Sequence, residues 1–285
     1  MGEERRTLIT ARELAALLDG ATGTVLLDVR WALGDARGRD HYEAGHIPGA
    51  IFVDLESELS ARPSPAAGRH PLPDAQDFAV SVRRWGINTD SAVVVYDATG
   101  ALAAARGWWL LRHAGIGNVR VLDGGLDAWE DGGHALQTGN NTAVPGNAQP
   151  GWGHMPVIDI DQAAAFPGHG ILLDSRAAER YRGEVEPIDP RAGHIPGARN
   201  RPVTENLDAG KRLLEPGELT RAYGQLGVKA GAGAQDVAAY CGSGVTAAHQ
   251  VLALETLGVR AALFPGSWSQ YCADPSRPAA TGATP

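Results

Sequence analysis

The sequence predicts an α/β protein with two tandem domains, each built on a mainly parallel sheet that helices cover on both faces. Three observations support this fold class: a repeat that runs through the chain, an alternation of strand-like and helical segments within the repeat, and a glycine- and proline-rich stretch between its two copies. The chain has 285 residues, enough for two domains that each have a core of their own.

The repeat consists of four segments of the first half that recur in the same order in the second half. Their offsets lie between 142 and 148 residues. The matched pairs are 26–30 with 172–176 (Leu-Leu-Asp-x-Arg), 45–50 with 193–198 (Gly-His-Ile-Pro-Gly-Ala), 93–100 with 237–244, and 124–129 with 266–271. A constant order at a nearly constant offset indicates a duplicated domain of about 130 residues, far longer than the unit of a solenoid.

The domain boundaries follow from a polar stretch in the middle of the chain. Residues 138–156 are rich in glycine and proline and show no apolar periodicity, which is typical of a linker. We therefore expect one domain over residues 8–137 and a second over residues 157–280.

Within the first domain, short apolar runs alternate with segments of helical periodicity. Residues 25–29, 93–96 and 119–122 predict strands, and residues 77–85 and 106–114 predict helices. This alternation favours a parallel sheet with helices on both faces. In such sheets the loops at the carboxyl ends of the strands host the chemistry.

The most informative loop of this kind holds Cys241. The apolar run 237–240 predicts a buried strand, Gly242 and Gly244 allow the following backbone to curl, and a helix is expected from Thr246. Backbone N–H groups and the positive end of the helix would then surround the thiol. Such surroundings lower a cysteine pKa into the range of roughly 3.5–7.5, so Cys241 is a candidate nucleophile. The alternative is that it is a small buried hydrophobic residue.

Composition excludes several other classes of function. The formal net charge is −8, which gives no basic surface for nucleic acid. The amino terminus lacks the apolar core of a signal peptide, and no apolar run is long enough for a membrane span. The two cysteines suggest no disulfide framework, and their spacing from histidines gives no metal motif. We expect a cytoplasmic protein with neither a nucleic-acid nor a membrane partner.

Taken together, the repeated motifs, the Cys-Gly-Ser-Gly-Val-Thr loop at 241–246 and the Pro-Gly-Ser-Trp-Ser segment at 265–269 resemble the two-domain rhodanese-type sulfurtransferases. The resemblance extends from about residue 8 to residue 275. It implies two rhodanese-like domains, of which the first is inactive because Asp97 stands at the nucleophile position. The second, with Cys241, would be catalytic.

Within this family, the loop is most similar to that of the 3-mercaptopyruvate sulfurtransferases. Gly242 and Ser243 stand where thiosulfate-preferring enzymes place basic residues. The resemblance implies that Arg180 and Arg191 hold the carboxylate and keto oxygen of the donor, with a small insertion around residues 185–189 before Arg191. A guanidinium fork suits such a carboxylate. Alternatively, both arginines form surface ion pairs that contribute little.

The resemblance also implies a polar relay of Ser243, His70 and Glu56. A serine hydroxyl can pass a proton or polarise the carbonyl of the donor when a histidine lies within hydrogen-bond reach. The alternative is that His70 is a loop histidine between prolines and that Ser243 merely donates to the sulfur. These three residues and Cys241 are the expected catalytic set.

The expected reaction is a two-step sulfur transfer without a metal or an organic cofactor. The Cys241 thiolate would take sulfur from 3-mercaptopyruvate and become a persulfide that the N–H groups of residues 242–246 hold, among them those of Gly244, Val245 and Thr246. The expected partners are a small-molecule donor and an acceptor such as thioredoxin, another thiol or cyanide. The protein is expected to be a monomer or a weak dimer.

Three alternatives to this reaction remain. Thiosulfate could be the main donor, or the protein could be a non-catalytic module that senses persulfides or binds proteins. A phosphatase is disfavoured, because the Cys-x5-Arg motif would need an arginine where Ala247 stands.

Residues that recur in both halves, including the half without the nucleophile, are expected to be structural. These are His46 and His194, Asp28 and Asp174, and Arg30 and Arg176. We expect the imidazoles to bond to the backbone beside the Ile-Pro-Gly turn, and the acidic and basic residues to tie loops together near the strand ends.

Overall fold

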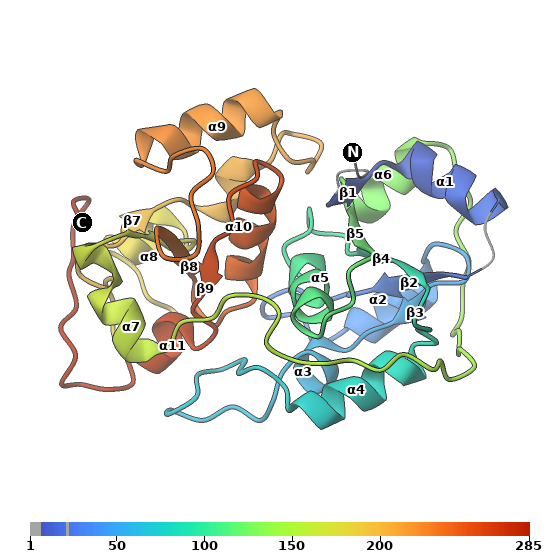
Figure 1. The fold of residues 1–285 in the computed structure, drawn as a ribbon, viewed down its shortest axis with the longest axis horizontal. Coiled ribbons are helices and arrows are strands. Elements are labelled where there is room, and N and C mark those ends of the chain that lie inside the picture. Colours follow the sequence, from blue (N-terminus) through green and yellow to red (C-terminus); the bar gives the residue numbers. More distant parts are fainter. Residues whose placement is uncertain (1–6, 21–22) are drawn as a thin grey trace. The chain divides into compact units, whose positions relative to one another are not determined.

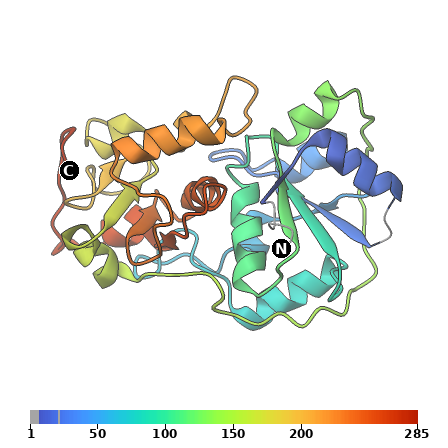
Figure 2. The same ribbon diagram turned by 45° about the horizontal axis from the view of Figure 1, so that its top comes forward.

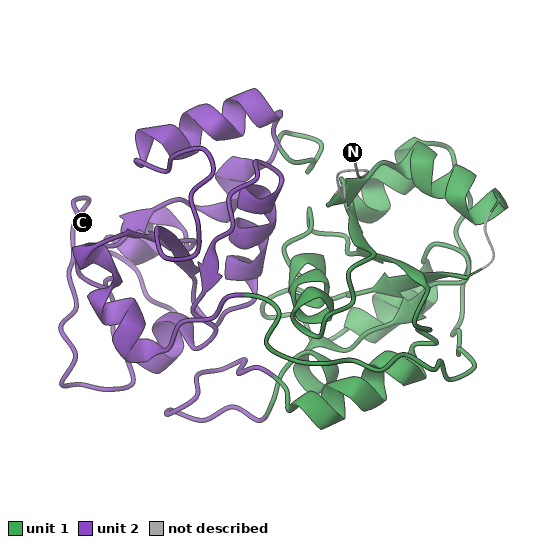
Figure 3. Ribbon diagram, viewed as in Figure 1, with its two compact units in different colours: residues 1–61, 73–155, 208–213 green, residues 62–72, 156–207, 214–285 purple. Residues whose placement is uncertain are grey.

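The computed structural model describes residues 7–20 and 23–285 and divides into two compact units (Figure 3). Unit 1 comprises Met1–Ala61, Pro73–Met155 and Asp208–Leu213, and unit 2 comprises Arg62–Leu72, Pro156–Leu207 and Leu214–Pro285. Each unit therefore contains a segment from the opposite half of the sequence, which the simple division at the linker did not predict. Most of the predicted linker, up to Met155, packs as part of unit 1.

Unit 1 is a five-stranded sheet in the order β1-β5-β4-β2-β3, and all of its pairings are parallel (Figure 1). The strands are β1 (Leu8–Ile9), β2 (Thr24–Asp28), β3 (Ile51–Phe52), β4 (Ala92–Tyr96) and β5 (Val119–Leu122). The helices are α1 (Ala11–Gly20), α2 (Gly38–Ala44), α3 (Leu55–Glu58), α4 (Ala75–Arg84), α5 (Ala104–His113) and α6 (Gly125–Asp131). The predicted strands and helices are confirmed to within about two residues at each end.

Helices cover both faces of the unit 1 sheet (Figure 2). Successive side chains of β4 point to opposite faces of the sheet, so both faces need to be covered. Val94 packs in one core cluster with Leu14 of α1 and Leu126 of α6. Val95 points to the opposite face, where α5 approaches so closely that a Cβ on Gly107 would lie 3.2 Å from the Val95 side chain. The sheet is thus a buried layer between helices.

Unit 2 repeats this plan with a four-stranded parallel sheet in the order β7-β6-β8-β9. The strands are β6 (Ile171–Asp174), β7 (Arg199–Asn200), β8 (Val237–Tyr240) and β9 (Ala262–Leu263). The helices are α7 (Ile160–Ala165), α8 (Ala178–Tyr181), α9 (Pro216–Gln225), α10 (Thr246–Glu255) and α11 (Ser267–Tyr271), with short 3-10 turns at Phe166–Gly168 and Val203–Asn206. Asp174 pairs with Tyr240 as Asp28 pairs with Tyr96, so the register of the central strands is also repeated.

The recurring histidines have the structural role that the sequence predicts. His46 Nδ1 lies 2.8 Å from the Tyr42 carbonyl oxygen, and His194 Nδ1 lies 2.8 Å from that of Tyr181. Each imidazole also stacks on the ring of the same tyrosine. The prediction that these histidines bond to the backbone is confirmed.

The recurring ion pairs tie the strand ends to the neighbouring loops. Arg30 contacts Asp28 and donates to the Gly45 carbonyl oxygen at 3.0 Å. Arg176 contacts Asp174 and donates to the Gly193 carbonyl oxygen at 2.7 Å. The predicted role is therefore confirmed in both units.

Three tryptophans are core side chains. Trp108 and Trp109 on α5 and Trp268 on α11 are fully buried. None of the helices in the part of the chain that the structure describes is long and apolar enough to cross a membrane.

Candidate active site

Cys241 lies directly after β8, at the carboxyl end of the central strand of unit 2. Its side chain is buried, and one side-chain and one backbone contact from α11 fix its main chain. The Cys241 N–H donates to the Ser267 Oγ at 3.0 Å, and the Trp268 N–H donates to the Cys241 carbonyl oxygen at 3.0 Å. Ser267 is a site residue that the sequence analysis missed, although it lies in the quoted Pro-Gly-Ser-Trp-Ser segment.

The loop after Cys241 turns a backbone donor toward the sulfur. The Gly244 N–H lies 3.1 Å from Sγ, and Gly244 has a φ of +83°. A Cβ at this position would lie 2.2 Å from the Pro265 carbonyl oxygen, so only glycine fits. Val245 then leads into α10, which begins at Thr246. The positive end of this helix therefore faces the thiol, as the sequence predicts.

The equivalent loop of unit 1 holds a carboxylate in the same place. Asp97 is buried, and its two oxygens accept four backbone N–H groups at 2.8–2.9 Å. The donors are Thr99 and Ala101 to Oδ1, and Ala103 and Ala104 to Oδ2. At the offset of 144 they correspond to Ser243, Val245, Ala247 and Ala248. The loop architecture shared by the two repeats is thus one that surrounds a negative group with amide donors.

Two residues of the expected relay lie within hydrogen-bond distance of each other. His70 Nδ1 is 2.7 Å from Ser243 Oγ, and both side chains are buried. Although His70 is distant in sequence, its segment, 62–72, belongs to unit 2. Glu56 belongs to unit 1, where its Oε1 accepts the indole N–H of Trp31 at 2.8 Å. Its part in the relay stays a prediction.

Two guanidinium groups lie over Gly242, the residue after Cys241. A Cβ on Gly242 would lie 3.0 Å from Arg69 Nη2 and 3.6 Å from Arg180 Nη1. The sequence analysis named Arg180 but not Arg69, which precedes His70 in the chain. Burial lowers the pKa of Arg69; the negative charge of Cys241 opposes this, and Arg180 lowers it further. The positive charge near the sulfur therefore comes from residues outside the loop.

Two buried carboxylates lie behind these arginines. Asp189 accepts hydrogen bonds from Arg69 Nη1 through Oδ1 and from Arg180 Nη2, at 3.1 Å, through Oδ2. Glu186 pairs with Arg180 at 2.6 Å and with Arg176 at 3.4 Å. The side chains of Glu186 and Asp189 are 4% and 3% exposed, whereas those of Arg180 and Arg69 are 15% and 28% exposed. The guanidinium groups thus form the accessible surface.

Arg191 does not join this group. Its guanidinium donates to the carbonyl oxygens of Arg277, at 2.8 Å, and Asp274, at 3.5 Å, and lies over the ring of Trp268. Arg180 instead contacts Asp189, which lies in the segment 185–189 before Arg191. The part of Arg191 in holding the donor stays a prediction.

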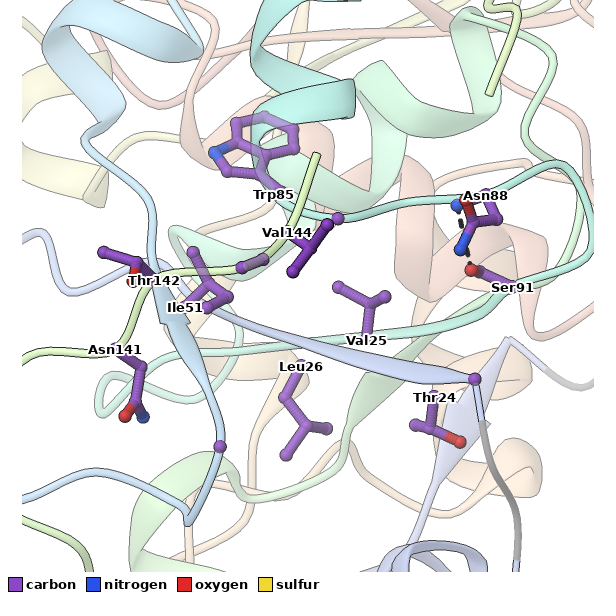
Figure 4. A pocket seen from close by; sticks show the side chains of 14 residues that line it. Thr24, Val25, Leu26, Ile51, Trp85, Asn88, Ser91, Asn141, Thr142 and Val144 are labelled. Carbon is purple, nitrogen blue, oxygen red and sulfur yellow. Dashed lines mark hydrogen bonds between the residues drawn. The ribbon is translucent and has the colours of Figure 1, made fainter. Parts of the chain in front are cut away.

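A separate hollow in unit 1 offers little chemistry. It has a volume of about 390 Å³ and lies beside the start of β2, where Thr24, Val25 and Asn88 are among its lining residues (Figure 4). None of the residues that line it has an ionisable side chain. The reactive groups named above lie elsewhere, so this hollow is not the candidate active site.

Comparison with known proteins places the fold and this loop in a family. Residues 10–131 and residues 159–274 each match the family model described as the rhodanese-like domain. The chain belongs to the rhodanese family. The two matched regions fall on either side of the predicted linker, and the second contains this rhodanese's Cys241 loop.

Relatives of this rhodanese are named sulfurtransferases but differ in the donor that their names give. A Mycobacterium tuberculosis protein provisionally named thiosulfate sulfurtransferase SseB is 44% identical over 97% of this chain and 98% of its own length. A Pseudomonas aeruginosa protein provisionally named 3-mercaptopyruvate sulfurtransferase is 45% identical over 96% of this chain and 98% of its own length.

A solved structure agrees with this assignment. The crystal structure of SseA from Escherichia coli, described as a 3-mercaptopyruvate sulfotransferase, superposes with a TM-score of 0.79 at 35% identity, covering 92% of this chain and 99% of that one. This rhodanese is therefore an enzyme of the sulfurtransferase class, as the sequence predicts.

Proposed function

We propose that this enzyme transfers sulfur from 3-mercaptopyruvate through a persulfide on Cys241. The observation that carries the proposal is the convergence of three groups on one loop. The Gly244 N–H reaches Sγ, the Ser243–His70 pair lies beside it, and Arg180 lies over Gly242. Together they supply a stabilised thiolate, a route for a proton and a cation for the carboxylate of the donor.

In the first step, the Cys241 thiolate attacks the thiol sulfur of 3-mercaptopyruvate. A sulfur–sulfur bond forms and the carbon–sulfur bond of the donor breaks, with its electron pair moving onto carbon to give the enolate of pyruvate. The proton of the donor thiol ends on that carbon, and the Ser243–His70 pair is suited to relay it. The products are pyruvate and a Cys241 persulfide, whose charge the backbone N–H groups stabilise.

In the second step, a nucleophilic acceptor takes the outer sulfur and regenerates the Cys241 thiolate. The proposal includes thioredoxin, a small thiol or cyanide as acceptor and requires no metal or organic cofactor, because the sulfur is carried on the cysteine itself. It places the reaction in the cytoplasm, where a chain with two free thiols and no disulfide framework is expected to work.

Thiosulfate is the second candidate donor, and the name of the M. tuberculosis relative favours it. The loop favours 3-mercaptopyruvate, because Gly242 and Ser243 add no positive charge for a dianion. The carboxylates of Glu186 and Asp189 also offset the charges of Arg69 and Arg180. A site with balanced charge suits a monoanionic donor better than a dianionic one.

The test is intact-protein mass spectrometry after brief exposure to each donor, followed by the ratio of the two specificity constants. We expect a gain of one sulfur atom on Cys241 that is faster with 3-mercaptopyruvate, and no gain in Cys241→Ser. A gain from thiosulfate alone would overturn the donor assignment. Turnover by the Cys241→Ser variant would refute the mechanism.

A further inference from the structure

We infer that unit 2 carries a second ligand site, apart from Cys241, which binds a small molecule through a phosphate group. The site is a hollow of about 530 Å³ beside the starts of β6 and β8, where Ile171 and Val237 are among its lining residues. Cys241 follows the opposite end of β8, roughly 13 Å away at the usual rise of a strand. Ligand binding in this unit 2 hollow is therefore separate from the proposed sulfur transfer. The volume of the hollow lies in the range of small-molecule sites.

The unit 2 hollow belongs to the architecture that the two repeats share, because the hollow of unit 1 lies at the equivalent place (Figure 4). Five positions line both hollows. The matched pairs are Gly23 with His169, Thr24 with Gly170, Val25 with Ile171, Gly86 with Gly227, and Asn88 with Lys229. Gly86 and Gly227 each stand two residues after a helix, α4 or α9, and have left-handed φ values of +82° and +84°. In two of the five pairs, unit 2 has a basic residue where unit 1 has an uncharged one.

In unit 1, part of the chain itself lies in this place. Four residues of the predicted linker, 141–144, line the hollow (Figure 4), and a Cβ on Gly86 would lie 2.8 Å from the Ala143 side chain. Among the described residues, the lining of the unit 2 hollow comes from two segments, 167–171 and 227–237. A place that the linker occupies in one repeat is thus open to an external ligand in the other.

The unit 2 hollow is basic in a protein that is acidic overall. Lys229 and His169 line it, and Arg199 lies at its border, where a Cβ on Gly227 would be 2.9 Å from Arg199 Nη1. Arg199 donates to a backbone carbonyl oxygen at 2.5 Å, and neither Lys229 nor Arg199 forms an ion pair within residues 7–20 and 23–285. Asp236 is the one acidic residue that lines the hollow, and its Oδ2 already accepts a backbone N–H at 2.9 Å. The excess of positive charge favours an anion.

A phosphate group matches the donors of this hollow. The Ala232 N–H donates to the Lys229 carbonyl oxygen at 3.2 Å and closes a turn in which Gly231 has a φ of +72°. The N–H groups of residues 229–231, which line the hollow, have no acceptor in the part of the chain that the structure describes. Backbone N–H groups of glycine-containing turns, lysine and arginine are the donors that commonly bind phosphate. A phosphate offers three accepting oxygens to these donors, whereas a carboxylate offers two.

Chemical labelling of lysine tests the site in the intact enzyme, because Lys211 and Lys229 are the only lysines of the chain. The enzyme is acetylated in the presence of inorganic phosphate, adenosine monophosphate or acetate at constant ionic strength, and peptide mass spectrometry gives the rate at each lysine. Lys211, which pairs with Asp127 in unit 1 at 2.7 Å, is the internal control. We expect a phosphate probe to slow the labelling of Lys229 about tenfold once its concentration exceeds its dissociation constant about tenfold. The rate at Lys211 should stay unchanged.

The probes also distinguish the source of the phosphate. Protection of Lys229 by adenosine monophosphate at a lower concentration than by inorganic phosphate would identify a phosphate ester as the ligand, and the reverse order would identify free phosphate. Both results support the site. Equal protection of the two lysines, or no protection by either phosphate probe, would overturn it. Protection by acetate as strong as that by phosphate would overturn the choice of anion.

A pair of arginine variants adds a second measurement. Arg199→Gln should raise the phosphate concentration that protects Lys229 about tenfold, as expected for a lost charge-assisted hydrogen bond. Arg221→Gln, which changes an exposed arginine on α9, should alter it less than about twofold, and sulfur transfer by both variants should stay within about twofold of the unmodified enzyme. Unchanged protection in Arg199→Gln would contradict a phosphate site bordered by Arg199. Labelling of the unmodified enzyme still tests the site if Arg199→Gln does not fold.

Discussion

The carboxylate of Asp97 offers a direct test of what the loop shared by the two repeats is built to hold. Four backbone N–H groups point at its two oxygens, at 2.8–2.9 Å. We consider the substitution Asp97→Asn, which keeps the shape of the side chain and replaces one oxygen by an amide nitrogen. That nitrogen is itself a donor, so it would face two N–H groups with no acceptor between them.

The size of the effect follows from this count. Each buried N–H group left without an acceptor costs about 1–3 kcal/mol, so two of them cost roughly 2–6 kcal/mol before any relaxation. The bonds that remain also lose the assistance of a full negative charge. Against a total stability of about 5–15 kcal/mol this is a large loss. It corresponds to a fall of roughly 10 °C in the Tm of unit 1.

Tryptophan fluorescence is a suitable readout, because six of the seven tryptophans belong to unit 1 and only Trp268 belongs to unit 2. Urea unfolding followed by fluorescence should show a lower midpoint for Asp97→Asn. The exposed Asp90→Asn serves as the matched control and should stay within about 0.5 kcal/mol of the unmodified protein. If Asp97→Asn did the same, the loop would have no preference for an anion. Stabilisation of a Cys241 thiolate by the corresponding loop of unit 2 would then have no parallel in unit 1.

Three further predictions address unit 2 and the effect of pH. Asp189→Asn removes a negative charge from behind the donor site. At an effective dielectric of ~20 and a separation of ~8 Å, its loss stabilises the bound donor by ~2 kcal/mol for each negative charge that the donor carries. The kcat/KM for thiosulfate divided by that for 3-mercaptopyruvate should therefore rise about tenfold or more. An unchanged ratio would contradict the role given to this charge. Ser267→Ala leaves the buried N–H of Cys241 without its acceptor. Persulfide formation should therefore slow, and the free energy of unfolding measured in urea should fall by about 1–3 kcal/mol. A variant that behaves like the unmodified protein in both measurements would show that the hydroxyl is dispensable. Burial lowers the pKa of His113 and His194 below the ordinary value of 6.5. Below that pH, the unfolded chain therefore binds more protons at these histidines than the folded protein does. The free energy of unfolding should decrease as the pH falls through about 6.5, and urea titrations of His113→Gln should show a smaller decrease. An equally large decrease in the variant would mean that other groups cause the pH dependence.

The fold and the position of Cys241 directly after a buried strand could be predicted from sequence because both depend on local patterns. The long apolar runs 93–96 and 237–240 are buried on both faces of their sheets, so their strand character is strong. The two-residue strands, such as Ile51–Phe52, were not predicted, because so short a segment has no measurable period. The glycine that turns the loop after Cys241 is also a local signal, since its positive φ favours glycine.

The charged surroundings of Cys241 could be predicted only in part, because they depend on contacts between distant segments. Arg69 lies 172 positions before Cys241, and Ser267 lies 26 positions after it. No periodicity connects such residues, and only the fold brings them together. Arg191 shows the opposite problem. Its position in a motif implies a role toward the donor, whereas its guanidinium donates to the Arg277 carbonyl oxygen and Asp189 is the residue that contacts Arg180. Its role stays a prediction.

The two repeats differ in chemistry through a small number of substitutions on one architecture. Where unit 1 has the carboxylate of Asp97, which accepts four backbone N–H groups, unit 2 has the thiol of Cys241. The surroundings of the thiol also include Arg69 and His70, since His70 Nδ1 lies 2.7 Å from Ser243 Oγ and Arg69 Nη2 lies over Gly242. Both lie on the segment Arg62–Leu72, which the first half of the chain encodes and which packs in unit 2. Unit 2 therefore cannot be assembled from the second half of the sequence alone, because it includes the segment Arg62–Leu72 of the first half.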